Sequence, residues 1–193
     1  MNKIKQLSLL IIVVYLSSCA AIYRNIGPEK INYPTPLGTE NVEISYRYDV
    51  LREAGNKKYP KKEIKNNIRV VAVKITNKTD TTIEISRDLD FYCGSSRVNL
   101  LTPIDIKESI KQNWPPYSLY LIGCISTSPL DIIVFGAIGV GNMAVAGGSN
   151  KKLLLELTKY DIRNKILEKG ESVIGLIGYE TLHADPIIVK LKR

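Results

Sequence analysis

The residue types that support proton-transfer chemistry are few in this chain of 193 residues. His183 is the one histidine, and Asp185 is too near to it in sequence to orient the ring as the acid of a hydrolytic triad does. On a strand, Asp88 and Asp90 would share one face, and two such carboxylates can bind calcium or transfer protons. We interpret His183 as an exposed loop residue and both aspartates as solvated. We therefore predict no catalytic residue, no metal site and no enzymatic activity.

The stretch from Gly139 to Ala144 has the letters Gly-x-Gly-x-x-Ala of a dinucleotide-binding turn, and Asp161 stands about twenty residues further on. Such a turn follows a strand and opens a helix, inside a repeated strand–helix pattern. That alternation is missing from this sequence. We interpret the small residues as sites of close packing and predict no cofactor.

The first nineteen residues have the order of an export signal. Lys3 and Lys5 precede an apolar run from Leu7 to Leu16, and Ser17 and Ser18 lead to Cys19. About ten apolar residues are too few to span the roughly 30 Å of a bilayer core. We predict that residues 1–18 are a signal peptide that delivers the chain and is then removed.

The four residues Leu16-Ser17-Ser18-Cys19 resemble the lipobox of bacterial lipoproteins. The resemblance implies that Cys19 is acylated and becomes the new N-terminus, and several acyl chains supply a durable anchor. Ala20, and not aspartate, follows the cysteine, which by resemblance to the sorting rule of Gram-negative lipoproteins implies the outer membrane. We expect a lipid-anchored protein that faces the periplasm and binds no nucleic acid.

The predicted export of the chain also bears on its other two cysteines, because disulfides form outside the cytoplasm. Cys93 and Cys124 both lie at or near apolar segments, in a compartment where disulfides persist. We predict a disulfide between them, which would close a loop of about thirty residues and stabilise the fold by roughly 3 kcal/mol. Two separately buried thiols are the alternative, since free cysteine packs as a small hydrophobe. A zinc site of the usual kind lacks ligands.

Alternating apolar residues indicate strands over much of the chain after residue 40. We expect strands at residues 42–48, 68–76, 82–85, 89–93, 98–101, 172–179 and 186–191, with 68–76 and 82–85 forming a hairpin. Short helices are expected at residues 104–113 and 150–160, and a lysine-rich loop at residues 52–67. Residues 19–40 contain Pro28, Pro34 and Pro36 and are expected to form an extended, lipidated tether.

Two short motifs resemble parts of small immunoglobulin-like domains of secreted bacterial proteins. The first is Val-Val-Ala-Val-Lys-Ile-Thr-Asn at residues 70–77 followed by Thr-Thr-Ile-Glu-Ile-Ser at 81–86, and the second is Lys-Gly-Glu-Ser-Val-Ile-Gly-Leu at 169–176. The predicted fold is mainly β, an immunoglobulin-like antiparallel β-sandwich over residues 41–193 with a helical or hairpin apolar insertion at about 103–168. The resemblance implies a binding or scaffolding module.

Residues 117–148 form an apolar, glycine-rich block in which Asp131 is the one formal charge. Neither of its halves reaches the roughly 20 residues of a spanning helix. We expect the block to fold back and be buried against the leucine face of residues 150–160. The alternatives are burial against a partner chain and insertion into a bilayer. The resulting hypothesis is an envelope lipoprotein that acts as a structural or binding module, with an envelope protein as partner. The alternative is a membrane-active or assembly component that inserts this block into a bilayer.

Overall fold

The computed structural model describes residues 20–34, 37–38, 41–113 and 129–192. Cys19, Cys124 and the predicted signal peptide lie outside these residues, as does the part of the apolar block before Pro129. The chain divides into two compact units. Unit 1 consists of Met1–Ala21 and Asn113–Ala146, and unit 2 consists of Ile22–Gln112 and Gly147–Arg193.

The described part of unit 1 is mainly helical. Helix α7 (Pro129–Lys159) supplies its residues up to Ala146 and continues into unit 2. In unit 1 the side-chain oxygen of Asn142 accepts a hydrogen bond from the backbone N–H of Ala20, at 2.9 Å. Over the described ranges, none of the helices combines the length and the apolar character needed to cross a bilayer.

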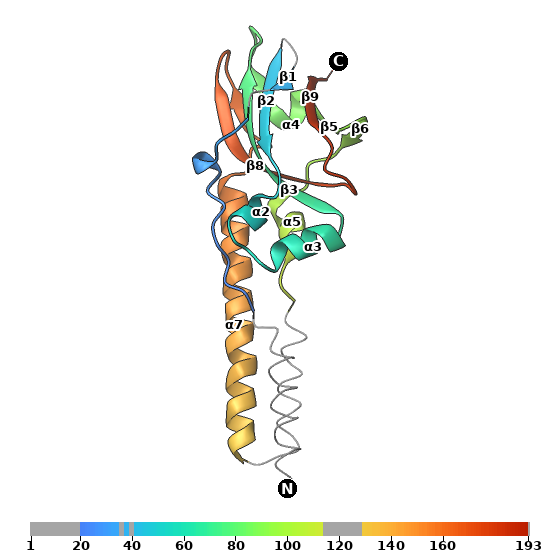
Figure 1. The fold of residues 1–193 in the computed structure, drawn as a ribbon. Helices are drawn as coiled ribbons and strands as arrows, with labels where there is room; N and C mark the ends of the chain where they lie inside the picture. The colour runs from blue at the N-terminus through green and yellow to red at the C-terminus, as the bar shows by residue number, and fades with distance from the viewer. Residues whose placement is uncertain (1–19, 35–36, 39–40, 114–128, 193) are drawn as a thin grey trace. The chain divides into compact units, whose positions relative to one another are not determined.

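Unit 2 contains three antiparallel sheets (Figure 1). The largest has the order β1-β2-β3-β8, the second β6-β5-β9, and the smallest joins β4 to β7. The strands are β1 (Leu37–Gly38), β2 (Val42–Arg47), β3 (Ile68–Asn77), β4 (Ile83–Glu84), β5 (Leu89–Cys93), β6 (Ser96–Val98), β7 (Ile166–Leu167), β8 (Ser172–Glu180) and β9 (Ile187–Leu191). The short helices are η1 (Pro28–Lys30), α2 (Val50–Glu53), α3 (Tyr59–Lys65), α4 (Ile85–Asp88) and α5 (Pro103–Ile110).

Strand β3 is the centre of the largest sheet and buries side chains on both of its faces. One face carries Val71, Val73 and Ile75, which share a core with β5 and β9 of the second sheet. The other face carries Val70 and Ala72, which pack with buried residues of α2, α5 and α7. A strand covered on both faces has a continuous apolar run, and the four residues Val70, Val71, Ala72 and Val73 form such a run in β3.

The layers are therefore sheet, sheet and helices. Antiparallel sheets were predicted and are confirmed, but the fold is mixed α and β and not mainly β. The reason lies on the second face of the largest sheet, which helices cover. In Figure 1, α2, α3 and α5 gather at one end of β3, and the last turns of α7 run along the same unit.

The predicted loop at residues 52–67 is wrong, because α3 occupies its second half. Pro60 lies in the first turn of α3, where the missing N–H is not needed. Tyr59 and Glu63 are four residues apart, face the interior and are buried. The composition of this stretch is lysine-rich and therefore indicates a loop. The lysines in fact lie on the solvent side of a helix whose other side packs on β3.

The predicted hairpin between residues 68–76 and 82–85 is also wrong. Both edges of β3 are taken by longer partners, β2 and β8, and β4 pairs with β7. The buried amide of Asn77 explains the change of direction: it donates to the carbonyls of Thr81 and Leu167, at 2.7 and 3.0 Å. The predicted strands at 42–48, 68–76, 89–93, 172–179 and 186–191 are confirmed, and the helix predicted at 104–113 is confirmed over Pro103–Ile110. The strand predicted at 98–101 is wrong in its bounds, because β6 ends at Val98.

The expected cover by residues 150–160 is also wrong for residues 129–148, the part of the apolar block that the structure describes. Residues 129–159 form one helix, so its leucine face cannot fold back onto the residues before it. Leu153 and Leu157 are instead buried in unit 2 against β3 and β8. Gly139 to Ala144 also lie inside this helix, and a dinucleotide-binding turn does not occur there.

Candidate functional site

The predicted site cysteines are only partly within the described residues. Cys93 ends β5 and is buried, whereas Cys19 and Cys124 lie outside the described residues. The Cys93–Cys124 disulfide and the acylation of Cys19 therefore stay predictions.

Cys93 lies beside two hydrogen-bonded tyrosines. The Tyr48 hydroxyl donates to the carbonyl of Asp185 at 2.6 Å and accepts from the Tyr179 hydroxyl at 2.7 Å. The Cys93 sulfur is 3.9 Å from the Tyr48 oxygen and 4.0 Å from the Tyr179 oxygen. Burial is the main cause that raises the pKa of both tyrosines, so both stay protonated. This cluster joins β2, β8 and the loop before β9 and has no group ready to accept a proton.

The titratable residues singled out in the sequence do not converge. His183 is exposed in the loop between β8 and β9. Asp88 ends α4 and Asp90 lies on β5, so the expected shared strand face does not exist. Arg87 holds the pKa of Asp88 at about 2, and Arg97 pairs with Asp90 at 2.6 Å. Across the described residues, no group of His, Cys, Asp and Glu side chains could hold a metal ion.

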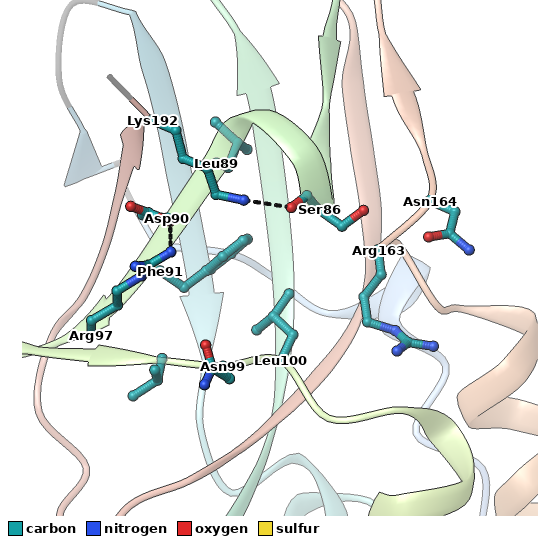
Figure 2. Close-up of a pocket in the computed structure, with 11 residues that line it drawn as sticks. Ser86, Leu89, Asp90, Phe91, Arg97, Asn99, Leu100, Arg163, Asn164 and Lys192 are labelled. Carbon is teal, nitrogen blue, oxygen red and sulfur yellow. Dashed lines mark hydrogen bonds and ion pairs between the residues drawn. The ribbon is translucent and has the colours of Figure 1, made fainter.

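A cavity of about 240 Å³ lies at the edge of the second sheet (Figure 2). Leu89, Phe91 and Leu100 give it an apolar floor, and Arg97, Arg163 and Lys192 bring three cations to its walls. Figure 2 shows that these cations come from three separate segments: the β5–β6 hairpin, the chain before β7, and the end of β9. An apolar floor under cationic walls suits a small group that is negatively charged at one end.

The cations of this cavity already have partners. Arg97 binds Asp90, and the Lys192 amine donates to the carbonyl of Ser86 at 2.7 Å (Figure 2). Arg163 binds Asp161 at 2.8 Å. A ligand would compete with these contacts. The cavity is thus a recess of mixed polarity and gives no basis for assigning catalysis.

A second polar site in unit 2 is the Glu156 carboxylate on α7. It is buried and accepts three hydrogen bonds from the segment after Cys19: the Tyr23 hydroxyl at 2.5 Å, the Ile26 N–H at 3.0 Å and the Gly27 N–H at 2.8 Å. Gly27 has a φ of 59°, which turns its N–H toward the carboxylate at a position where other residues are strained. Burial and this carboxylate raise the pKa of Tyr23, so its hydroxyl remains a donor.

The same segment is fixed at two further points. Asn56 forms a pair of hydrogen bonds with the backbone of Arg24, at 2.9 and 2.8 Å, and the Ser149 hydroxyl accepts from the N–H of Tyr23 at 3.1 Å. The Tyr23 ring packs edge-on against Tyr59, with 5.5 Å between centroids. The segment expected to be a tether is therefore part of the folded unit from Tyr23 onward.

All three chain crossings between the units lie close together on the unit 2 side. The chain enters at Ile22, leaves at Gln112 and returns at Gly147. Asn150 connects them: its side chain exchanges two hydrogen bonds with the backbone of Gln112, at 2.9 and 3.0 Å, and accepts from the Tyr59 hydroxyl at 3.1 Å. Tyr23 joins the group through Ser149 and Tyr59. We call this end of unit 2 the junction.

Comparisons with protein-family models, with curated proteins and with solved structures found no match for this chain.

Proposed function

We propose that this protein is an envelope lipoprotein, held in the outer membrane through acyl chains on Cys19, and that unit 2 acts as a structural or binding module facing the periplasm. No catalytic step is part of the proposal. It rests on the order of charged, apolar and small residues before Cys19, together with the position of Tyr23, which is buried in unit 2 only four residues after Cys19.

The observation that carries the proposal is the docking of Tyr23. This residue lies four positions after Cys19, and it is buried and bound to Glu156. A signal peptide that is removed before Cys19 would leave a mature chain whose ordered fold begins almost at its first residue. The acyl chains would then be fixed to the junction of unit 2 and not to the end of a free linker.

A second candidate function has its own supporting observation. The chain leaves unit 2 at Gln112 and re-enters it at Gly147, both at the junction, and the apolar block lies between Gln112 and Ser149 in the sequence. The residues that flank the block in unit 2, Gln112 and Ser149, are therefore held beside the segment that leads to Cys19. This favours insertion of the block into the membrane that carries the anchor, alone or in an assembly. Insertion would explain what covers so much contiguous apolar sequence.

The immunoglobulin-like relationship is part of the proposal for unit 2. Two antiparallel sheets that share one core support it, since that is the architecture of such domains. Binding modules of this architecture use exposed sheet edges and loops. The cavity between the β5–β6 hairpin and Arg163 lies at such a sheet edge and is where we propose that a partner could bind.

The test is expression of the full chain in a Gram-negative host beside a Cys19→Ala variant. We expect an intact mass that lacks residues 1–18 and carries acyl chains, in the outer-membrane fraction, and an unprocessed precursor for the variant. Retention of Met1 to Ser18 with an unmodified Cys19 in the native chain would contradict the proposal. To separate the two candidates, residues 20–193 are exported behind a conventional signal peptide: release by alkaline carbonate favours the module alone, and retention in the membrane favours insertion.

A further inference from the structure

The lysine-rich stretch around α3 has a surface that the functions considered above do not use. Five of the nine residues from 57 to 65 are lysines, namely Lys57, Lys58, Lys61, Lys62 and Lys65, and we call this set the lysine face. Lys57, Lys61 and Lys65 are exposed, and Lys58 and Lys62 are partly exposed. Within the described residues, Lys57, Lys61, Lys62 and Lys65 have no ion-pair partner.

The single acid of this stretch does not reach the surface. Glu63 is buried and accepts the N–H of Val70 on β3 at 2.8 Å. Because Glu63 points inward, the charges that this stretch presents to solvent are all positive. The sequence pattern alone, in which an acid interrupts the lysines, suggests a more balanced surface than the fold produces.

An apolar side chain lies among these cations. Ile64 is 53% exposed on α3, between Lys61 and Lys65. Lysines attract an anionic surface through long-range charge, and their own stems tolerate an apolar boundary. An exposed isoleucine gains from contact with that boundary but gains nothing from a purely polar polyanion. The combination therefore favours a lipid surface over a soluble anion.

The lysine face is also next to the proposed anchor. Tyr59, the first residue of α3, packs on Tyr23 and donates to Asn150. Asn56, directly before the lysines, is bonded to Arg24. The lysines thus begin beside the segment that leads to Cys19, at the same end of unit 2 as the three chain crossings. Figure 1 shows α3 at this end of β3, together with α2 and α5.

We propose that the lysine face binds the anionic phospholipid head groups of the membrane that holds the acyl chains of Cys19, with Ile64 at the acyl boundary. The inference rests on the proposed anchoring. Each lysine that approaches a charged surface contributes about a fivefold gain in binding. Several lysines together would fix unit 2 in one orientation on the membrane, where the acyl anchor alone leaves it free to rotate.

The experiment uses the mature lipoprotein reconstituted into two kinds of vesicle, phosphatidylcholine alone and phosphatidylcholine with phosphatidylglycerol. An amine-reactive reagent labels the lysines, and peptide mass spectrometry gives the labelling rate of each. We expect Lys57, Lys61 and Lys65 to react several-fold more slowly in the anionic vesicles, with the difference lost at high salt. The exposed Lys165, Lys169 and Lys190 serve as internal references and should react equally in both.

A matched pair of variants tests whether the protection depends on the lysine face or on positive charge anywhere on unit 2. In Lys57→Glu/Lys61→Glu/Lys65→Glu, protection of Lys62 in anionic vesicles should be lost, whereas Lys165→Glu/Lys169→Glu/Lys190→Glu should keep it. Equal labelling of the lysine face in both vesicles would overturn the proposal. Protection seen in native envelopes but in neither vesicle would overturn it as well, in favour of a protein partner. Intact mass of the same sample reports acylation separately, so failure of the anchor and failure of the lysine face are distinguishable.

Discussion

The Glu156 carboxylate accepts a 2.5 Å hydrogen bond from the hydroxyl of Tyr23, although 133 positions separate the two residues in the chain. This contact joins the residues behind Cys19 to the last turns of α7. It makes the N-terminal segment a structural component of unit 2, and it leads directly to the first prediction.

Tyr23→Phe should lower the free energy of unfolding by about 1.5–3 kcal/mol, the usual worth of a hydrogen bond to a charged group. The ring contact with Tyr59 is kept, so the change isolates the hydroxyl. Tyr33→Phe is the matched control, because its hydroxyl donates to the carbonyl of Pro28 in a partly exposed position and should cost less. Urea unfolding measures both. An equal decrease in the free energy of unfolding for the two variants would show that the hydrogen bond to Glu156 stabilises the segment no more than an ordinary hydrogen bond does.

Glu63 predicts a pH dependence of stability. Burial raises its pKa to about 7, from an ordinary value of 4.5, and the Val70 N–H and Arg69 only partly oppose this. Between these two values the folded state keeps a proton that the unfolded state has released. The free energy of unfolding should therefore fall as pH rises from 4.5 to 7, by about 3 kcal/mol.

Glu63→Gln should remove most of that slope and leave the protein more stable than the native chain at pH 8. Glu108→Gln is a control with the opposite sign. Glu108 is exposed, bonded to Lys107 and Lys111, and its pKa is lowered to about 2, so its contribution is lost only in acid. Thermal unfolding across pH 2–8 tests the pair, because the Glu108 window lies below pH 4.5 and the Glu63 window above it. An unchanged slope between pH 4.5 and 7 in Glu63→Gln would rule out this carboxyl as the source.

Gly175 on β8 should not tolerate replacement by a residue with a side chain. A Cβ there would collide with Ile162 and with the backbone carbonyl of Tyr160, which accepts the N–H of Leu176 at 2.8 Å. Backbone cannot move aside, so Gly175→Ala should cost about 3 kcal/mol. In Gly148→Ala the new methyl meets open space on a helix, and stability should rise by up to about 1 kcal/mol. Chemical denaturation of the two variants compares them, and a tolerated Gly175→Ala would contradict this packing.

The Cys93–Cys124 disulfide remains a prediction for the exported protein. Peptide mapping of the mature chain without reductant should recover the linked pair, and thiol counting in denaturant should find neither cysteine free. Reduction should then lower the free energy of unfolding by roughly 3 kcal/mol. Two free thiols per chain would establish the alternative of separate burial, with Cys93 resting between Tyr48 and Tyr179.

The sequence predicted the strands better than their partners. Alternation marks β2, β5 and β9 because one face of each is buried, and it marks β3 through its β-branched residues. Pairing depends on contacts far apart in the chain, such as the Asn77 amide that reaches Leu167. Glu156 and Glu63 show the same limit for the site. In the sequence, Glu156 looks like an ordinary surface acid on a predicted helix and Glu63 like one in a predicted loop. Only the docking of Tyr23 and of β3 gives them a role.

On the proposed anchoring, the binding of Tyr23 to Glu156 would also limit how far unit 2 can reach from the membrane. A free linker from residue 19 to residue 40 would let the domain range over roughly 75 Å, at about 3.5 Å per extended residue. With Tyr23 bound, only the four residues from Cys19 to Ile22 remain, so on the proposed anchoring the acyl chains would lie within about 14 Å of the folded unit. On the proposed anchoring, unit 2 works as a fixture of the membrane surface. Whatever it binds must come to that surface.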